Sequence, residues 1–315
     1  MEYRRLGDSG LVVSVAGLGC NNFGRRLDID GSRRVVDAAL DAGITLFDTA
    51  DMYGDSELHL GELLQGRRDD VVIATKFGMH ADHNGPDWQA RGSRAYIRRA
   101  VESSLRRLRT DWIDLYQLHR PDPDTPIEET LAALTELVHE GKIRYLGSSN
   151  LTGWQIADAD WTASSSGYER FISAQNHYSL LERGVEAEVI GACERFGIGM
   201  LPYFPLASGL LTGKYRRGEG APEGTRLGGS PRADRWLRDD YFDVVEALGA
   251  YAHKRGVGLL DVALGGLAAQ PAVSSVIAGA TRPEQIEANV AATAWSPSED
   301  DLAELDRIAP TARSS

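Results

Sequence analysis

The sequence predicts an α/β protein built as a single (β/α)8 barrel, and three observations support this prediction. Eight short apolar segments alternate with amphipathic stretches along the 315 residues. Polar residues directly follow several of these segments, as expected where the carboxyl ends of barrel strands carry functional groups. The first segment leads into Gly17-Leu18-Gly19-Cys20-Asn21-Asn22-Phe23-Gly24, which lacks the G-x-G-x-x-G spacing of a doubly wound sheet.

The elements can be assigned in order along the chain. Turn residues in Leu6-Gly7-Asp8-Ser9-Gly10-Leu11 separate two apolar runs, so we expect a β-hairpin over Tyr3–Ser14. The barrel helices are recognised by apolar residues at helical spacing. The expected strands are Val15–Gly19, Ile44–Asp48, Val71–Thr75, Trp112–Leu118, Ile143–Gly147, Phe171–Gln175, Ile198–Tyr203 and Ser275–Ala278. The expected helices are Ser32–Ala42, Ser56–Leu64, Tyr96–Leu108, Ile127–Val138, Gly153–Ala163, Val185–Phe196 and Pro283–Ala292.

The longest segment without a periodic pattern is Ala207–Asp240, which is rich in Gly, Pro and Arg. A loop of this length inside a compact domain is usually a lid or a binding loop. No linker or low-complexity stretch divides the chain, so residues 1–315 are expected to form one domain.

Composition excludes several classes of function. A net charge of −12 without a basic cluster argues against a nucleic-acid surface. The sequence contains no run of 18 apolar residues, so no membrane span is expected. No apolar run follows the N-terminus, so no signal peptide is expected. Cys20 and Cys193 are too few for a disulfide framework, so a cytoplasmic location is expected. His and Cys do not occur at zinc-ligand spacing, and no metal site is predicted. The oligomeric state cannot be predicted.

Four proton-handling residues follow three successive predicted strands. Asp48 and Tyr53 follow the second strand, Lys76 ends the third, and His119 ends the fourth. Singly, each could be a capping, packing or solvated residue. Because parallel strands of a barrel end at the same face, we expect the four side chains to meet in one pocket.

Such a group is suited to protonating a carbonyl oxygen. A phenol with a pKa near 10 is a weak acid, and an adjacent ammonium such as Lys76 is expected to lower that pKa. Asp48 would hold Lys76 in place, and His119 would orient the carbonyl or relay the proton. The hydride must come from a nicotinamide or a flavin, because no side chain supplies one.

Several motifs together resemble the aldo-keto reductase family, in its bacterial and potassium-channel-β-like branch. The similar segments cover nearly the whole chain in the family's order. They are Asp48-Thr49-Ala50-Asp51-Met52-Tyr53-Gly54, Ala74-Thr75-Lys76, Leu115-Tyr116-Gln117-Leu118-His119-Arg120-Pro121-Asp122, Gly147-Ser148-Ser149-Asn150, Ala174-Gln175-Asn176, Pro202-Tyr203-Phe204-Pro205-Leu206, Gly209-Leu210-Leu211-Thr212-Gly213-Lys214-Tyr215 and Ile277-Ala278-Gly279-Ala280-Thr281-Arg282-Pro283-Glu284-Gln285.

The resemblance implies a barrel that binds NADP(H) across the strand ends. By the same resemblance, Tyr53 is the general acid, Lys76 and Asp48 tune it, and His119 orients the substrate. Tyr203 would stack on the nicotinamide, and Ser149, Asn150 and Gln175 would bind the carboxamide. The other residues implied to bind the cofactor are Gly19, Cys20, Asn21, Asp48, Pro205, Leu206, Ser208, Gly209, Thr212, Lys214, Arg226, Gly279, Thr281, Arg282, Gln285 and Asn289.

Two of these residues are expected to contact cofactor phosphates, and one of them bears on the choice between NADP(H) and NAD(H). Arg282 lies near the position where the family meets the 2′-phosphate, which favours NADP(H) and leaves NAD(H) as the alternative. Lys214 is expected to contact a cofactor phosphate. The segment Gly209–Lys214 is not a P-loop, because the spacing between its glycines is one residue short and Tyr215 replaces the required Ser or Thr.

The predicted function is therefore the NADP(H)-dependent reduction of aldehyde or ketone carbonyls, or the reverse oxidation. Phe23 and Trp88 are candidates for the substrate pocket, whose loops leave the small-molecule substrate undetermined. One alternative is a nicotinamide-binding regulatory subunit with little turnover, as in the channel-associated branch. Another is a different (β/α)8 enzyme, such as a phosphate-substrate isomerase or a glycosidase. A glycosidase would need two facing carboxylates at strand ends, where only Asp48 is present.

Overall fold

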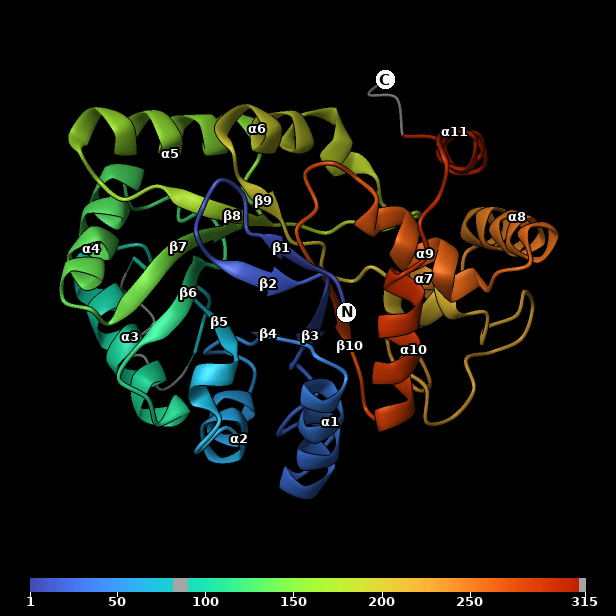
Figure 1. Ribbon diagram of the computed structural model, residues 1–315, viewed down its shortest axis with the longest axis horizontal. Helices are drawn as coiled ribbons and strands as arrows, with labels where there is room; N and C mark the ends of the chain where they lie inside the picture. Colours follow the sequence, from blue (N-terminus) through green and yellow to red (C-terminus); the bar gives the residue numbers. More distant parts are fainter. Residues whose placement is uncertain (82–89, 312–315) are drawn as a thin grey trace.

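The computed structural model describes residues 1–81 and 90–311. Its centre is a sheet of eight parallel strands in the order β10-β3-β4-β5-β6-β7-β8-β9, with helices on the outside (Figure 1). The strands are β3 (Ala16–Gly19), β4 (Leu46–Asp48), β5 (Val72–Phe77), β6 (Ile113–Leu118), β7 (Ile143–Ser149), β8 (Phe171–Gln175), β9 (Gly199–Met200) and β10 (Val276–Gly279).

Backbone hydrogen bonds between the two end strands close the sheet into a barrel. The Met200 amide donates to the Ala272 carbonyl at 2.7 Å, and the Ser274 amide donates to the Met200 carbonyl at 3.0 Å. Further along, the Ile277 amide donates to the Pro202 carbonyl at 3.1 Å. All eight strands therefore end at one rim, and the predicted (β/α)8 barrel is confirmed.

A two-stranded hairpin covers the amino-terminal end of the barrel. Strands β1 (Tyr3–Arg5) and β2 (Val12–Ser14) pair antiparallel, as predicted, and lie across the barrel (Figure 1). Leu6 and Val13 are fully buried in one cluster with residues from the strands that point into the barrel. The hairpin thus closes this end with apolar side chains, and the opposite rim is left to carry the polar groups.

Helices follow the strands in the expected alternation. The seven predicted helices are present within a few residues, the sixth being divided into the short 3-10 turn Gly184–Ala187 and α6. The first six helices are α1 (Ile29–Asp41), α2 (Ser56–Leu63), α3 (Arg94–Leu108), α4 (Ile127–His139), α5 (Gly153–Ser166) and α6 (Val189–Phe196). The later helices are α7 (Ala233–Trp236), α8 (Asp239–Arg255), α9 (Leu259–Ala268), α10 (Pro283–Thr293) and α11 (Glu299–Ile308).

The prediction missed α7, α8, α9 and α11. Helix α9 is apolar around its whole circumference and buried from Val262 to Ala268, so it lacks the one-sided pattern that marks a surface helix. The segment Ala207–Asp240 is also not irregular throughout. It contains the 3-10 helix η4 (Ala207–Thr212), α7 and the first two residues of α8. Within the described residues, no helix combines the length and apolar character needed to cross a bilayer.

Asp114 joins the amino-terminal halves of three neighbouring strands. It is almost fully buried on β6 and accepts hydrogen bonds from the Ile73 amide of β5 at 3.0 Å and from Arg144 of β7 at 3.1 Å. Arg68 donates to the same carboxylate at 2.6 Å. A buried carboxylate with this many partners fixes the register of the strands around it.

We expect Asp114→Ala to lower the free energy of unfolding by about 3 kcal/mol, because it leaves Arg68 and the Ile73 amide without their buried acceptor. Urea denaturation followed by circular dichroism measures the change. The control is Asp111→Ala, which removes an exposed carboxylate and should change stability by less than about 0.5 kcal/mol. Equal effects of the two substitutions would contradict a structural role for Asp114.

Candidate active site

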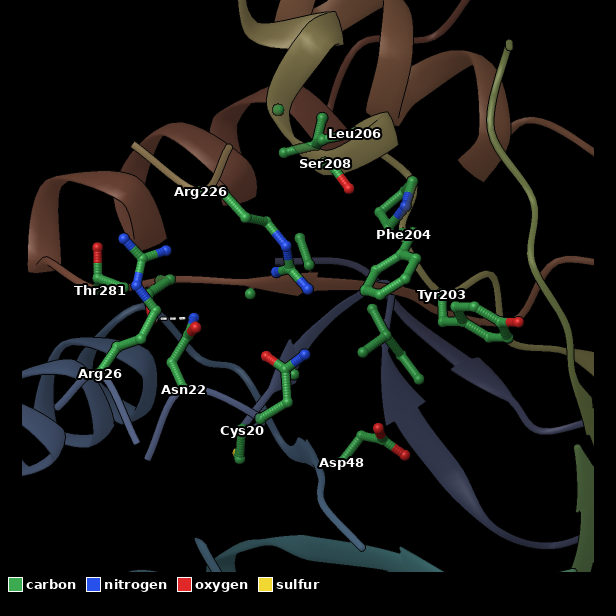
Figure 2. A pocket seen from close by; sticks show the side chains of 18 of the residues that line it. Cys20, Asn22, Arg26, Asp48, Tyr203, Phe204, Leu206, Ser208, Arg226 and Thr281 are labelled. Carbon is green, nitrogen blue, oxygen red and sulfur yellow. Dashed lines mark hydrogen bonds between the residues drawn. The ribbon is translucent and has the colours of Figure 1, made fainter. Parts of the chain in front are cut away.

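A pocket of about 990 Å³ opens at the carboxyl ends of the strands. All eight barrel strands contribute to its wall, through their last residues or the loops that follow them. Figure 2 shows side chains from distant parts of the sequence, including Cys20, Asp48, Tyr203 and Arg226, around this one cavity. The position agrees with the rim at which (β/α)8 proteins gather their functional groups.

Lys76 and Asp48 form a buried ion pair at the inner end of the pocket. Lys76 Nζ lies 2.8 Å and 2.7 Å from the two carboxylate oxygens of Asp48 and donates to the Thr49 carbonyl at 2.7 Å. Burial disfavours the ammonium, but the neighbouring charges of Asp48 and Tyr53 outweigh it and raise the pKa of Lys76. Lys76 is therefore a fixed cation at neutral pH.

Tyr53 is held beside this pair by the loop after β4. The Tyr53 amide donates to the Ala50 carbonyl at 3.1 Å, and Lys76 Nζ lies 5.2 Å from the Tyr53 ring centroid. The loop after β3 supports this turn from outside. A Cβ at Gly24 would approach the Cβ of Asp55 to 2.5 Å, so the two loops are in close contact only because residue 24 is glycine.

The pKa of Tyr53 is raised above its ordinary value of 10.0. Burial of the phenol is the largest cause, and it outweighs the charge and hydrogen bonding of Lys76, which act to lower the pKa. The expected lowering effect of the ammonium is therefore present, but the net shift of the Tyr53 pKa is upward. The physical reason is that the phenolate would lose its hydration at this depth, while the negative charge of Asp48 offsets part of the effect of Lys76.

His119 lines the pocket and packs edge-on against Tyr53, with ring centroids 5.8 Å apart. Its amide donates to the Phe77 carbonyl at 2.8 Å, which fixes the end of β6 against β5. Burial first, and then the charges of Lys76 and Arg120, lower the pKa of His119 to about 2. The imidazole is therefore neutral at physiological pH and can exchange hydrogen bonds without carrying charge.

Tyr203 forms an aromatic platform in the wall of the pocket (Figure 2). One face of its ring stacks on His177 at 5.4 Å and an interplanar angle of 10°. Its hydroxyl donates to Asn150 Oδ1 at 2.8 Å, and Asn150 Nδ2 in turn donates to the His119 carbonyl at 3.0 Å. The platform is thus hydrogen-bonded to the strand end that carries His119.

The other part of the pocket is strongly cationic. Lys214 and Arg226 come from the segment after η4 and Arg282 from the loop after β10, and none of them forms an ion pair within the described part of the chain. The pKa of Lys214 is lowered, first by burial and then by the charges of Arg26, Arg226 and Arg282. The guanidinium of Arg226 lies 4.7 Å from the Phe204 ring centroid and points into the cavity (Figure 2). Uncompensated cations at this density fit a ligand with several phosphates.

The backbone around this pocket is locally strained. Asn150, Phe204, Ala207 and Ser208 have φ angles of 61°, 54°, 46° and 58°, a region that non-glycine residues seldom adopt. All four lie on segments that border the pocket. Strained residues of this kind persist where the surrounding structure enforces them, and they are concentrated at functional sites.

The structure brings most of the predicted site residues together. Asp48, Tyr53, Lys76 and His119 lie together, with Lys76 behind the wall of the pocket and the other three in it. Phe23, expected at the substrate pocket, is instead fully buried in the hydrophobic core. Trp88 lies outside the described residues. All the predicted cofactor residues line the pocket, namely Gly19, Cys20, Asn21, Asp48, Ser149, Asn150, Gln175, Tyr203, Pro205, Leu206, Ser208, Gly209, Thr212, Lys214, Arg226, Gly279, Thr281, Arg282, Gln285 and Asn289.

Sequence reasoning missed two contributors, Gln117 and Arg26. Gln117 Nε2 lies 3.3 Å from Asp48 Oδ1, beside the 2.7 Å bond from Gln175, so two amides hold the carboxylate that holds Lys76. Arg26 donates to the Gly224 carbonyl at 3.1 Å and so joins the loop after β3 to the segment after η4. Inward-facing positions at strand ends could have identified Gln117, whereas no sequence signal identified Arg26.

Comparisons with known proteins agree with this geometry. The model of the Aldo/keto reductase family matches residues 16–310. The chain is 37% identical to an uncharacterized oxidoreductase of Bacillus subtilis, over 98% of this chain and 96% of the relative. It is also 37% identical to a probable voltage-gated potassium channel subunit beta of Arabidopsis thaliana, over 93% of this chain and 91% of the relative.

A third relative carries a reductase name. Versiconal hemiacetal acetate reductase of Aspergillus parasiticus is 33% identical, over 92% of each chain. The family match spans the entire barrel, and the relatives are covered almost end to end. The chain belongs to the aldo/keto reductase family.

Proposed function

We propose that the protein is an NADP(H)-dependent carbonyl reductase in which Tyr53 is the general acid. The observation that carries the proposal is the packing of Tyr53 against both the charged Lys76–Asp48 pair and the neutral His119 at the end of a cationic pocket. Family membership supports oxidoreductase chemistry in general. The choice of cofactor and the role of Tyr53 are the parts proposed here.

The residues present fit a nicotinamide dinucleotide. Lys214, Arg226 and Arg282 would hold its phosphates, and Arg282 immediately precedes α10, whose N-terminus adds backbone amides and a favourable dipole. Tyr203, backed by His177, offers its other face to a flat ring. When bound, the reduced nicotinamide supplies the hydride for the carbonyl carbon.

The side chains then act on the carbonyl oxygen. His119, neutral and fixed at the end of β6, orients the oxygen toward Tyr53. Tyr53 donates its phenolic proton as negative charge develops there. Lys76 stabilises the phenolate left behind, and Asp48 keeps Lys76 charged and in position. For alcohol oxidation the same groups act in the opposite direction.

A regulatory subunit with little turnover is the second candidate, because one relative is named as a probable channel beta subunit. The complete set of Tyr53, Lys76, Asp48 and His119 favours turnover over this alternative. Turnover measurements on purified protein separate the two functions.

The role of Tyr53 as the general acid can be tested by substitution. We expect Tyr53→Phe to lower kcat for aldehyde reduction by about 10³-fold, because it removes the proton donor and leaves the ring in place. NADPH oxidation measured at 340 nm gives the rate, and fluorescence titration gives the affinity for NADPH, which should be retained. The control is Tyr145→Phe, on the hairpin side of the barrel. A fast Tyr53→Phe enzyme would exclude Tyr53 as the acid, and slow turnover by the wild type would favour the regulatory function.

The second prediction concerns pH. Tyr53 must be protonated to act as an acid, and its raised pKa keeps it protonated until the pH exceeds 10. His119 does not titrate between pH 5 and 9, because its pKa is lowered to about 2. We therefore expect kcat/KM for reduction to be level from about pH 6 to pH 9 and to fall above about pH 10. A decline near pH 6.5 that disappears in His119→Gln would contradict the neutral, buried state of His119.

The third prediction concerns the cofactor. If Arg282 binds the 2′-phosphate, Arg282→Leu should raise KM for NADPH on the order of tenfold and leave KM for NADH within about twofold. Steady-state kinetics with both cofactors measures the difference, with the exposed Arg34→Leu on α1 as the control. Equal kcat/KM values for NADPH and NADH in the wild type would exclude a preference for NADP(H).

A further inference from the structure

The pocket is far more positive than the protein around it. Seven of its lining residues are Arg or Lys and two are acidic, although the chain carries a net charge of −12. One of the two acidic residues, Asp48, is already neutralised by Lys76. A cleft lined by one sign of charge concentrates the field and attracts ligands of the opposite sign.

The phosphates of the proposed cofactor account for only part of this charge. Lys214, Arg26, Arg226 and Arg282 form one group, in which burial, and then the charges of the three guanidinium groups, lower the pKa of Lys214. Arg120 is not among the charges that act on Lys214. Its charge acts on His119 and on Tyr203, the two side chains that flank the position proposed for carbonyl reduction.

Arg120 is also available to a ligand. Its side chain is exposed at the pocket wall, and it forms no ion pair or hydrogen bond within residues 1–81 and 90–311. The nearby carboxylate of Asp122 is turned to other partners, the Gly92 amide and the Thr125 hydroxyl. The backbone beneath Arg120 is fixed, because His119 is hydrogen-bonded to Phe77 on one side and to Asn150 on the other.

We propose that Arg120 binds a carboxylate on the substrate, so that the enzyme prefers aldehydes or ketones that carry a carboxylate over neutral ones of the same shape. This inference rests on the proposed reductase function. A guanidinium can make two parallel hydrogen bonds to a carboxylate, which fixes the orientation of the substrate as well as holding it. Its position next to His119 in the chain places the bound anion beside the carbonyl that His119 and Tyr53 receive.

The experiment compares 4-carboxybenzaldehyde with its methyl ester at saturating NADPH. The two substrates share the reacting aldehyde and differ in one negative charge. We expect the wild type to favour the acid, and Arg120→Met to reduce the ratio of kcat/KM for acid over ester on the order of tenfold. Arg120→Lys should retain part of the preference, because it keeps the charge and loses the two-pronged geometry. The preference should also weaken as ionic strength rises.

The matched control is Arg34→Met, which removes an exposed arginine on α1 outside the pocket and should leave the ratio unchanged. An equal fall for acid and ester in Arg120→Met would mean that Arg120 acts on the catalytic geometry. A rise in the Kd of NADPH in that variant would assign Arg120 to the cofactor. Either result overturns the inference while leaving the reductase in place. Absence of turnover with both substrates and with other carbonyls would overturn the reductase function, and the inference with it.

Discussion

The ion pair between Lys76 and Asp48 is the interaction on which the rest of the site depends. A fully buried ammonium is tolerated only when a counter-charge and hydrogen bonds replace its hydration. Here the counter-charge comes from β4, and amides from β6 and β8 hold that carboxylate in turn. Lys76 and Asp48 lie on adjacent strands, whereas Gln117 and Gln175 come from strands that are not neighbours of β4 and reach its carboxylate across the interior of the barrel.

The charge of Lys76 acts to lower the pKa of both His119 and Tyr53, but the two groups end in different states. Burial, and then the charge of Lys76, lower the pKa of His119 and keep the imidazole neutral. The same charge works against burial at Tyr53, where burial prevails and keeps the phenol protonated. A neutral hydrogen-bonding ring beside a protonated phenol is the state in which a carbonyl oxygen can be oriented and then protonated. Burial thus has the largest effect on both protonation states, and the charge of Lys76 adds to it at His119 and opposes it at Tyr53.

In the outer part of the pocket, by contrast, positively charged side chains on loops line the cavity. Arg26, Lys214, Arg226 and Arg282 come from three separate segments, and their mutual repulsion is tolerated without acidic partners among the described residues. Such an arrangement stores unfavourable energy that an anionic ligand relieves. The left-handed backbone at Phe204, Ala207 and Ser208 indicates that the segment after β9 is likewise shaped for binding at some cost to its own stability.

The sequence by itself determined the barrel and the residues at its rim. Alternating apolar segments fixed the order of the strands, and Asp48, Tyr53, Lys76 and His119 were identified because each follows a strand whose end must lie at that rim. Helix α9 escaped detection because a helix buried on all sides has no polar face to reveal its period. Only the tertiary structure decided that burial raises the pKa of Tyr53 in spite of Lys76, and that Phe23 lies in the core. Those properties depend on how deeply a side chain lies and on which distant charges surround it, and both are fixed only when the barrel closes.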